Sequence, residues 1–337
     1  MADTPQKFAA FMLREADKGK PPQAALEQIG RDELPQESVL VRVAYSTLNY
    51  KDGLAITGSA PIVRRFPMVA GIDLAGEVVE SASDRFAPGD EVVVNGYGLS
   101  ERHWGGYAQY ARVRDEFLLK LPRPLTPFQA MAFGTAGYTA ALCVLALEEG
   151  GVKPAQGPIL VTGASGGVGS VAVQLLAQRG FEVTACSGSA AAEARLTQWG
   201  AKEILPRTDL AEAQGPLGSE RWAGVVDSVG SQILANAIAQ TRYGGVAAAC
   251  GLAAGADLPL TVLPLILRGV RIQGVDSVMA PMTLREQAWA LLAQAAEKLS
   301  FDGFAATHGL NELPQLAQTI LTGEIVGRVV IDVNKGA

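Results

Sequence analysis

The spacing of apolar residues changes character near residue 126. Before it, the stretches 38–47, 71–81, 89–98 and 107–113 alternate apolar and polar positions or are rich in β-branched residues, and "APGD" marks a turn. They predict short strands in a mostly antiparallel β region. After it, strand and helix patterns alternate, starting with a helix that has Thr126 as predicted N-cap and Pro127 as first residue.

The alternating part predicts an α/β fold with a doubly wound parallel sheet. Six apolar strands are expected at 158–163, 182–188, 203–207, 223–230, 246–253 and 270–275. A further helix is expected at 283–300 and a last strand at 327–333, which we expect to return the chain to the first domain. The predicted division is a first domain at 1–126, a nucleotide-binding domain at 127–275, and a return to the first domain at 276–337.

Charge and cysteine content narrow the classes of partner. The 337 residues carry a formal net charge of -6, so no overall basic field favours nucleic acid or an anionic membrane. Residues 130–147 contain no charge and reach the lower length limit of a membrane span, but small and polar residues favour a buried helix. The first residues lack the build of a secretory signal, and three scattered cysteines favour reduced thiols, so we expect a cytoplasmic protein.

A glycine-rich turn, "VTGASGGVGS", follows the first strand of the alternating part. The spacing G-x-G-x-x-G is present with Ala164 in the first place, then Gly166 and Gly169. In a dinucleotide-binding fold this turn lies against a pyrophosphate, which backbone N–H groups and the positive end of the helix hold. A purely structural turn between strand and helix is the alternative, and the strand–turn–helix context favours dinucleotide binding.

The end of the second strand bears on which dinucleotide binds. An acidic residue there would hydrogen-bond the ribose 2′-hydroxyl and repel a 2′-phosphate. This chain has Ser187 and Ser189 instead, and Arg207 at the end of the third strand offers a cation. The pattern favours NADPH, although the serines would equally serve as N-caps of the next helix.

Other chemistries lack their residues. The two histidines, His103 and His308, are not spaced with a cysteine as a zinc pair would be, and the three cysteines fall in core-like positions. The G-x-S-x-G pattern of serine hydrolases occurs only within the glycine-rich turn, at 163–167, and the G-K-[ST] of nucleoside triphosphatases does not occur.

Several motifs together resemble a known family. They are "NYKDGLAITG", "RRFPMVAGIDLAGEVVES", "HWGGYAQYARV", "GTAGYTAALCVLALE", "VTGASGGVGSVAVQLL", "WAGVVDSVG", "YGGVAAACGLA" and "LILRGVRIQGVDSVM", and the likeness runs from Phe8 to Val333. The chain resembles the medium-chain dehydrogenase/reductase superfamily, in its zinc-free acrylyl-CoA reductase branch, once called quinone oxidoreductase-like. Zinc members carry a cysteine and a histidine where this chain has Ser46, Thr47 and Ile72.

The resemblance implies a GroES-like catalytic domain of mostly antiparallel strands, a Rossmann domain, and metal-free, NADPH-dependent reduction of acrylyl-CoA to propanoyl-CoA. It places Tyr50 at the nicotinamide, where its hydroxyl would donate to the developing oxyanion or its ring would cover the cofactor. The cofactor contacts that it implies are Tyr50, Ser165, Gly166, Gly167, Val168, Ser187, Arg207, Leu252, Ile266 and Ser277. Because "SGSAAAEA" has no arginine after Gly188, the resemblance implies a weaker 2′-phosphate contact.

The remaining expectations concern substrate and assembly. Arg64 and Arg65, with Arg102 behind them, are candidates for the phosphates of coenzyme A, the alternative being ordinary solvated charges. The strand at 270–275 would lie at a sheet edge and pair with its own copy, so we expect a homodimer. An NADPH:quinone oxidoreductase and a non-catalytic NADPH-binding protein remain alternative functions.

Overall fold

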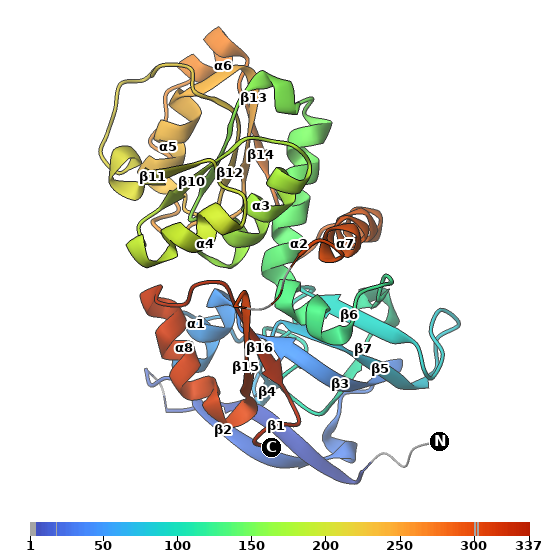
Figure 1. Cartoon of the computed structure of the whole chain (residues 1–337). Coiled ribbons are helices and arrows are strands. Elements are labelled where there is room, and N and C mark those ends of the chain that lie inside the picture. The colour runs from blue at the N-terminus through green and yellow to red at the C-terminus, as the bar shows by residue number, and fades with distance from the viewer. Residues whose placement is uncertain (1–4, 18, 300, 302) are drawn as a thin grey trace. The chain divides into compact units, whose positions relative to one another are not determined.

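The computed structural model describes residues 5–17, 19–299, 301 and 303–337 and divides the chain into two compact units (Figure 1). The first unit comprises residues 1–135 and 300–337, and the second comprises 136–299. These divisions lie further along the chain than the expected ones at 126/127 and 275/276. The helix after residue 281 stays with the second unit because Trp289 stacks on Tyr138 with ring centroids 6.4 Å apart.

The second unit contains the predicted parallel sheet. Six described strands pair in the order β11-β10-β9-β12-β13-β14, all in parallel. They are β9 (Ile159–Thr162), β10 (Val183–Ser187), β11 (Glu203–Pro206), β12 (Trp222–Asp227), β13 (Thr241–Ala249) and β14 (Arg271–Gly274). The expectation of a doubly wound, six-stranded sheet is confirmed. Its inner strands β9 and β12 are wholly buried, which explains their continuous apolar runs.

Helices connect these strands in two directions from the middle of the sheet. The helices α3 (Gly167–Gln178) and α4 (Glu193–Gln198) lead to β10 and β11, whereas α5 (Ser231–Ala239) and α6 (Leu263–Arg268) lead to β13 and β14. The strand order therefore reverses between the neighbours β9 and β12. Ligands of such sheets bind beyond the carboxyl ends of the strands at this point. The unit also holds α7 (Met282–Ala296).

The first unit is built mainly from antiparallel strands, as the sequence predicts. One sheet has the order β15-β16-β3-β5-β6-β8, with β7 also on β3, and a second sheet has the order β2-β1-β4. The strands are β1 (Lys7–Arg14), β2 (Gln23–Gly30), β3 (Val39–Thr47), β4 (Met68–Val69), β5 (Asp73–Ser81), β6 (Glu91–Asn95), β7 (Tyr110–Val113), β8 (Leu119–Lys120), β15 (Ala305–Gly309) and β16 (Arg328–Asp332). The helices are α1 (Tyr50–Thr57) and α8 (Leu313–Thr322).

The end of the chain returns to the first unit, as expected. Strand β16 pairs antiparallel with β3, so Val330 lies opposite Thr47. The apolar side chains of both segments join one core with β5 and β6. The apolar pattern of the sequence did not predict β1, β2, β15 or the helices α1 and α8.

Helix α2 (Pro127–Glu149) begins as predicted, with Thr126 Oγ1 accepting from the Gln129 backbone N–H at 3.2 Å. Its helical geometry is interrupted at Gly134, where φ is 54° and where a Cβ would lie 2.5 Å from Thr47 Cγ2. Among the described residues it is the one helix that is long and apolar enough, by length and composition, to cross a membrane. Of its most apolar window, 83% is buried within the protein, which is usual for a core helix.

Candidate functional site

The glycine-rich turn connects β9 to α3 at the carboxyl edge of the parallel sheet. Gly163 has φ 58° and makes the tight turn, so the alanine at 164 keeps an ordinary backbone conformation and is buried. A Cβ on Gly169 would lie 2.3 Å from the Gly163 carbonyl oxygen, so only glycine lets helix and turn approach this closely. Gly166 precedes the helix as its N-cap, and a Cβ there would meet only that oxygen, at 3.3 Å.

A polar cluster lies beside this turn, where β10 and β11 end. Ser187 Oγ donates to Ser165 Oγ at 3.1 Å and accepts from the Ser189 N–H at 3.1 Å. The Ser189 side chain makes no capping bond to the short helix that it precedes, so the cap alternative does not account for it. The guanidinium of Arg207 packs over Gly188. Among the described residues the exposed Arg207 makes no ion pair, so its charge is free to meet an anion.

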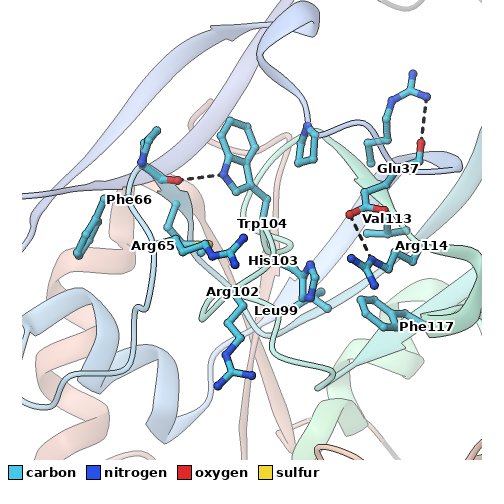
Figure 2. A pocket seen from close by; sticks show the side chains of 14 residues that line it. Glu37, Arg65, Phe66, Leu99, Arg102, His103, Trp104, Val113, Arg114 and Phe117 are labelled. Atoms are coloured by element: carbon cyan, nitrogen blue, oxygen red, sulfur yellow. Dashed lines mark hydrogen bonds and ion pairs between the residues drawn. The ribbon is translucent and has the colours of Figure 1, made fainter.

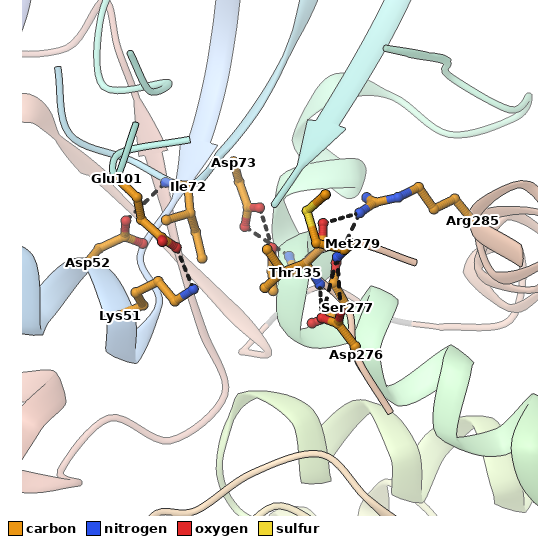
Figure 3. A network of polar contacts seen from close by, with 11 residues as sticks. Lys51, Asp52, Ile72, Asp73, Glu101, Thr135, Asp276, Ser277, Met279 and Arg285 are labelled. Carbon is orange, nitrogen blue, oxygen red and sulfur yellow. Dashed lines mark hydrogen bonds and ion pairs between the residues drawn. The ribbon is translucent and has the colours of Figure 1, made fainter. Parts of the chain in front are cut away.

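Two more predicted residues follow strands that end at this edge. Leu252 comes after β13 and is 65% exposed, and Ser277 comes after β14. The Ser277 loop is anchored by buried Arg285, whose Nη2 donates to the carbonyls of Ser277 at 3.2 Å and Val278 at 2.7 Å (Figure 3). No sequence motif predicted this anchoring arginine.

Ile266 is not brought to this edge. It lies in α6, whose Arg268 donates to the carbonyls of Gly218 and Ala239, just before β13 begins. Within the second unit, Figure 1 shows α6 at the opposite end of the sheet. The physical reason is the crossover: a parallel connection must carry the chain back to the amino edge before β14 starts.

A buried acidic residue holds the next turn of the same edge. Asp227, at the end of β12, accepts from Thr162 Oγ1 at 2.6 Å and from the Gly230 N–H at 2.8 Å. Burial raises the pKa of its carboxyl group. In the sequence, "VVDSVG" shows a single acidic residue at the end of an apolar run, a pattern that does not by itself predict these hydrogen bonds.

In the first unit, Tyr50 is the first residue of α1 and is 52% exposed. The preceding Asn49 and the buried Asp52 form a capping box, in which Asp52 Oδ2 accepts from the Asn49 N–H at 2.9 Å. These two side chains brace the start of the helix. Lys51 pairs with Glu101 at 2.8 Å (Figure 3).

A buried polar network surrounds this helix start. Asp73 Oδ2 accepts from Asn49 Nδ2 at 2.9 Å, and Oδ1 accepts from Asn95 Nδ2 at 2.8 Å. Asp73 also binds Thr135, where Oδ2 accepts from the backbone N–H at 2.8 Å and Oδ1 accepts from the hydroxyl (Figure 3). Asp52 Oδ1 accepts from the Ile72 N–H at 3.0 Å. Burial, aided by the charge of Asp73, raises the pKa of Asp52 to about 7.

One buried cation faces the two carboxylates. Arg328, at the start of β16, donates to Thr47 Oγ1 at 2.9 Å, Asn49 Oδ1 at 3.2 Å and the Ala132 carbonyl at 3.2 Å. Burial lowers the pKa of Arg328, and the charge of Asp73 acts in the opposite direction. The sequence pattern did not predict this contact, because Arg328 lies more than 250 residues from Thr47 and Asn49 along the chain.

A separate pocket of about 340 Å³ lies wholly within the first unit (Figure 2). Arg65 and Arg102 line it, whereas Arg64 does not; the Arg64 N–H donates to the Glu101 carbonyl at 2.8 Å. Of the arginines that the sequence offers for coenzyme A, Arg65 and Arg102 therefore line a concave surface and Arg64 does not.

Two family models match the chain in succession. Residues 35–123 match the alcohol dehydrogenase GroES-like domain, and residues 167–294 match the zinc-binding dehydrogenase family. The chain belongs to the medium-chain dehydrogenase/reductase superfamily. Among the residues that the structure describes, no group of three or more His, Cys, Asp or Glu side chains could hold a metal ion.

Members of this superfamily resemble the chain over nearly all of its length. The probable acrylyl-CoA reductase AcuI of Escherichia coli is 48% identical over 96% of this chain and 99% of its own. The putative quinone oxidoreductase YhfP of Bacillus subtilis is 42% identical over 91% of this chain and 93% of its own. The crystal structure of the YhdH oxidoreductase of Salmonella enterica in complex with NADP is 46% identical, with a TM-score of 0.93 over 96% of this chain and 99% of that one.

Proposed function

We propose that this medium-chain reductase reduces the carbon–carbon double bond of acrylyl-CoA, with NADPH, to give propanoyl-CoA in the cytoplasm. The observation that supports it most directly is the cluster of Ser165, Ser187 and Arg207 beside the glycine turn. The cluster offers donors and a free positive charge where an acid would repel a 2′-phosphate. The likeness to the E. coli AcuI protein supports the choice of substrate.

The residues fit the cofactor on structural grounds. The backbone of Gly166, Gly167 and Val168 leaves a turn without side-chain bulk, which suits a pyrophosphate, and Leu252 and Ser277 stand at the same edge. Bound NADPH supplies the hydride that adds to the β-carbon of the thioester. The chain's part is to orient the thioester, to stabilise the negative charge that develops on its oxygen, and to let a proton reach the α-carbon.

Tyr50 is the proposed donor to that oxygen. Its exposure and its place at the first turn of α1 leave the hydroxyl accessible, while the capping box and the network beneath hold the backbone still. The other role, a ring that covers the nicotinamide face, requires no hydroxyl. We expect Tyr50→Phe to lower kcat by at least tenfold with acrylyl-CoA. Full turnover in Tyr50→Phe would leave only the covering role.

The function is tested by following NADPH oxidation with acrylyl-CoA, crotonyl-CoA and a simple quinone. We expect kcat/KM for acrylyl-CoA to exceed that for the quinone by orders of magnitude. The name of the B. subtilis relative favours the quinone as the second candidate, and faster turnover of the quinone would decide for it. NADPH binding without oxidation by any acceptor would leave a non-catalytic binding protein.

The proposed assembly is a homodimer formed at β14. This strand ends the parallel sheet, its four residues are all exposed, and Ile272 is 37% exposed. Pairing with its own copy across a two-fold axis would extend the sheet and cover the free edge. Light scattering at micromolar concentration should give twice the mass of one chain, and a species of 35.2 kDa would refute the dimer.

A further inference from the structure

The pocket of the first unit is strongly cationic. It is lined by four arginines, Arg65, Arg102, Arg112 and Arg114. One acidic side chain, that of Glu37, also lines it. The four arginines differ in what they already bind, and that difference decides which of them are available to a ligand.

Two of the four are occupied by carboxylates. Arg112 pairs with Glu80 at 3.0 Å, and Arg114 pairs with Glu37 at 3.3 Å. Arg65 and Arg102 are exposed and, among the described residues, neither makes an ion pair. The pocket therefore carries two unneutralised guanidinium groups, which is the chemistry that recognises phosphate.

Planar apolar surface adjoins these charges. Trp104 is half-buried, and its indole N–H donates to the Pro67 carbonyl at 3.0 Å, which fixes the ring (Figure 2). Phe66 is 38% exposed, and Phe117 stacks on Tyr97 with centroids 4.6 Å apart. Rings that are held in place beside a cleft offer a stacking surface for a nucleobase at little cost in conformational entropy.

The pKa of His103 depends on the charges that line the pocket. Burial lowers the pKa of its imidazole, and the charges of Arg114, Arg65 and Arg102 lower it further, against the opposing charge of Glu37. The ring packs edge-on against Phe117, 5.2 Å between centroids. An anion bound among these arginines would offset their positive charge at His103 and raise its pKa.

The pocket is linked to the start of α1 through one loop. Arg102 follows Glu101, which pairs with Lys51, the residue next to Tyr50. The loop that lines the pocket therefore also braces the proposed reacting end in the same unit.

We propose that this pocket binds the 3′-phosphorylated adenosine diphosphate end of coenzyme A. Arg65 and Arg102 hold phosphates, and the aromatic rings face the adenine. Free inorganic phosphate would use the arginines but not the rings, whereas this group uses both. The proposal rests on the proposed function in naming coenzyme A as the source of the nucleotide.

The kinetic test compares acrylyl-CoA with acrylyl-pantetheine, which lacks the nucleotide end. We expect Arg65→Ala and Arg102→Ala each to raise KM for acrylyl-CoA about tenfold at unchanged kcat, with no change for acrylyl-pantetheine. The matched control is Arg42→Ala, an exposed arginine of the same unit that pairs with Glu77 at 2.7 Å outside the pocket. Equal effects on both thioesters, or none on either, would overturn the proposal.

A binding test does not require turnover. Adenosine 3′,5′-bisphosphate is added to protein saturated with NADP+, so that the dinucleotide turn is already filled, and both histidines are titrated by NMR. We expect the pKa of His103 to rise, whereas the NMR signals of His308, which lies against Glu312 at 2.7 Å outside the pocket, should not respond to the added nucleotide. If the pKa of His103 rises but the protein does not reduce acrylyl-CoA, the nucleotide site is supported and the proposed function is wrong. An unshifted His103 would reject the site.

Discussion

At the end of β10, a hydroxyl and a guanidinium stand where a carboxylate would select against NADPH. Ser187 is buried and oriented by two hydrogen bonds, whereas Arg207 is exposed and packs over Gly188. Ser187 therefore positions the end of β10, and Arg207 provides the positive charge for the 2′-phosphate. The preference for NADPH over NADH should therefore depend chiefly on one side chain.

We predict that Arg207→Ala raises KM for NADPH about tenfold, because one charge-assisted contact to the 2′-phosphate is lost. KM for NADH should stay within twofold, since NADH has no such phosphate. Steady-state kinetics with both cofactors measure the two values. A parallel rise for both would assign Arg207 to the shape of the sheet edge and not to phosphate recognition.

Asp52 should make the unfolding free energy depend on pH. Its folded pKa of about 7 lies above the unfolded value of 3.8, so the native state holds a proton that the unfolded state has lost. Stability from this group is therefore present at low pH and falls as pH rises toward 7. Between pH 5.5 and 7 we predict a loss of about 2 kcal/mol from this group.

The measurement is urea unfolding of wild type and Asp52→Asn across that range. Asp52→Asn is less stable overall, because one backbone N–H loses its acceptor. Its stability should nevertheless change less steeply with pH, and the difference in slope isolates Asp52 from His103, whose lowered pKa acts in the opposite direction. Equal slopes would show that the carboxyl group titrates normally.

At the scale of the element, the turn between β9 and α3 separates two uses of glycine. Gly169 is needed for the close approach of helix and turn, and Gly166 borders the space proposed for the pyrophosphate. The sequence pattern treats both as members of one motif, whereas the geometry assigns them different tasks.

We predict that alanine at Gly169 lowers stability, whereas alanine at Gly166 weakens cofactor binding. Gly169→Ala should lower the unfolding free energy by about 2–3 kcal/mol, because its Cβ would overlap backbone atoms that cannot rotate away. Gly166→Ala should unfold at nearly the wild-type urea concentration but bind NADPH at least tenfold more weakly. Urea unfolding and NADPH titration by fluorescence separate the two effects. Normal stability of Gly169→Ala would contradict the packing role.

On the scale of the molecule, the first unit is assembled from both ends of the chain. Arg328 on β16 donates to Thr47 and Asn49, where β3 leads into α1, and to Ala132 on α2, so three segments distant in sequence meet at one buried cation. The carboxylates of Asp52 and Asp73 lie in the same network. Removing the cation would leave buried negative charge without compensation.

Arg328→Met should therefore lower the unfolding free energy by about 3–5 kcal/mol. The control is Arg179→Met, since Arg179 pairs with Glu148 on the surface and should cost less than about 1 kcal/mol. Both are read from urea denaturation curves. Similar small losses for the two variants would show that water or a rearranged side chain compensates inside the network.

The sequence by itself determined the two-part architecture, the six parallel strands, the return of the last strand, and the turn around Gly166, because apolar periodicity and glycine spacing are local properties of the chain. Only the tertiary structure decided which charges are partnered. Arg65 lines the pocket whereas Arg64 does not, and Ile266 lies in α6, away from the carboxyl edge of the sheet. Arg328 hydrogen-bonds Asn49 and Thr47. These outcomes depend on contacts between segments far apart in sequence, which no local pattern encodes.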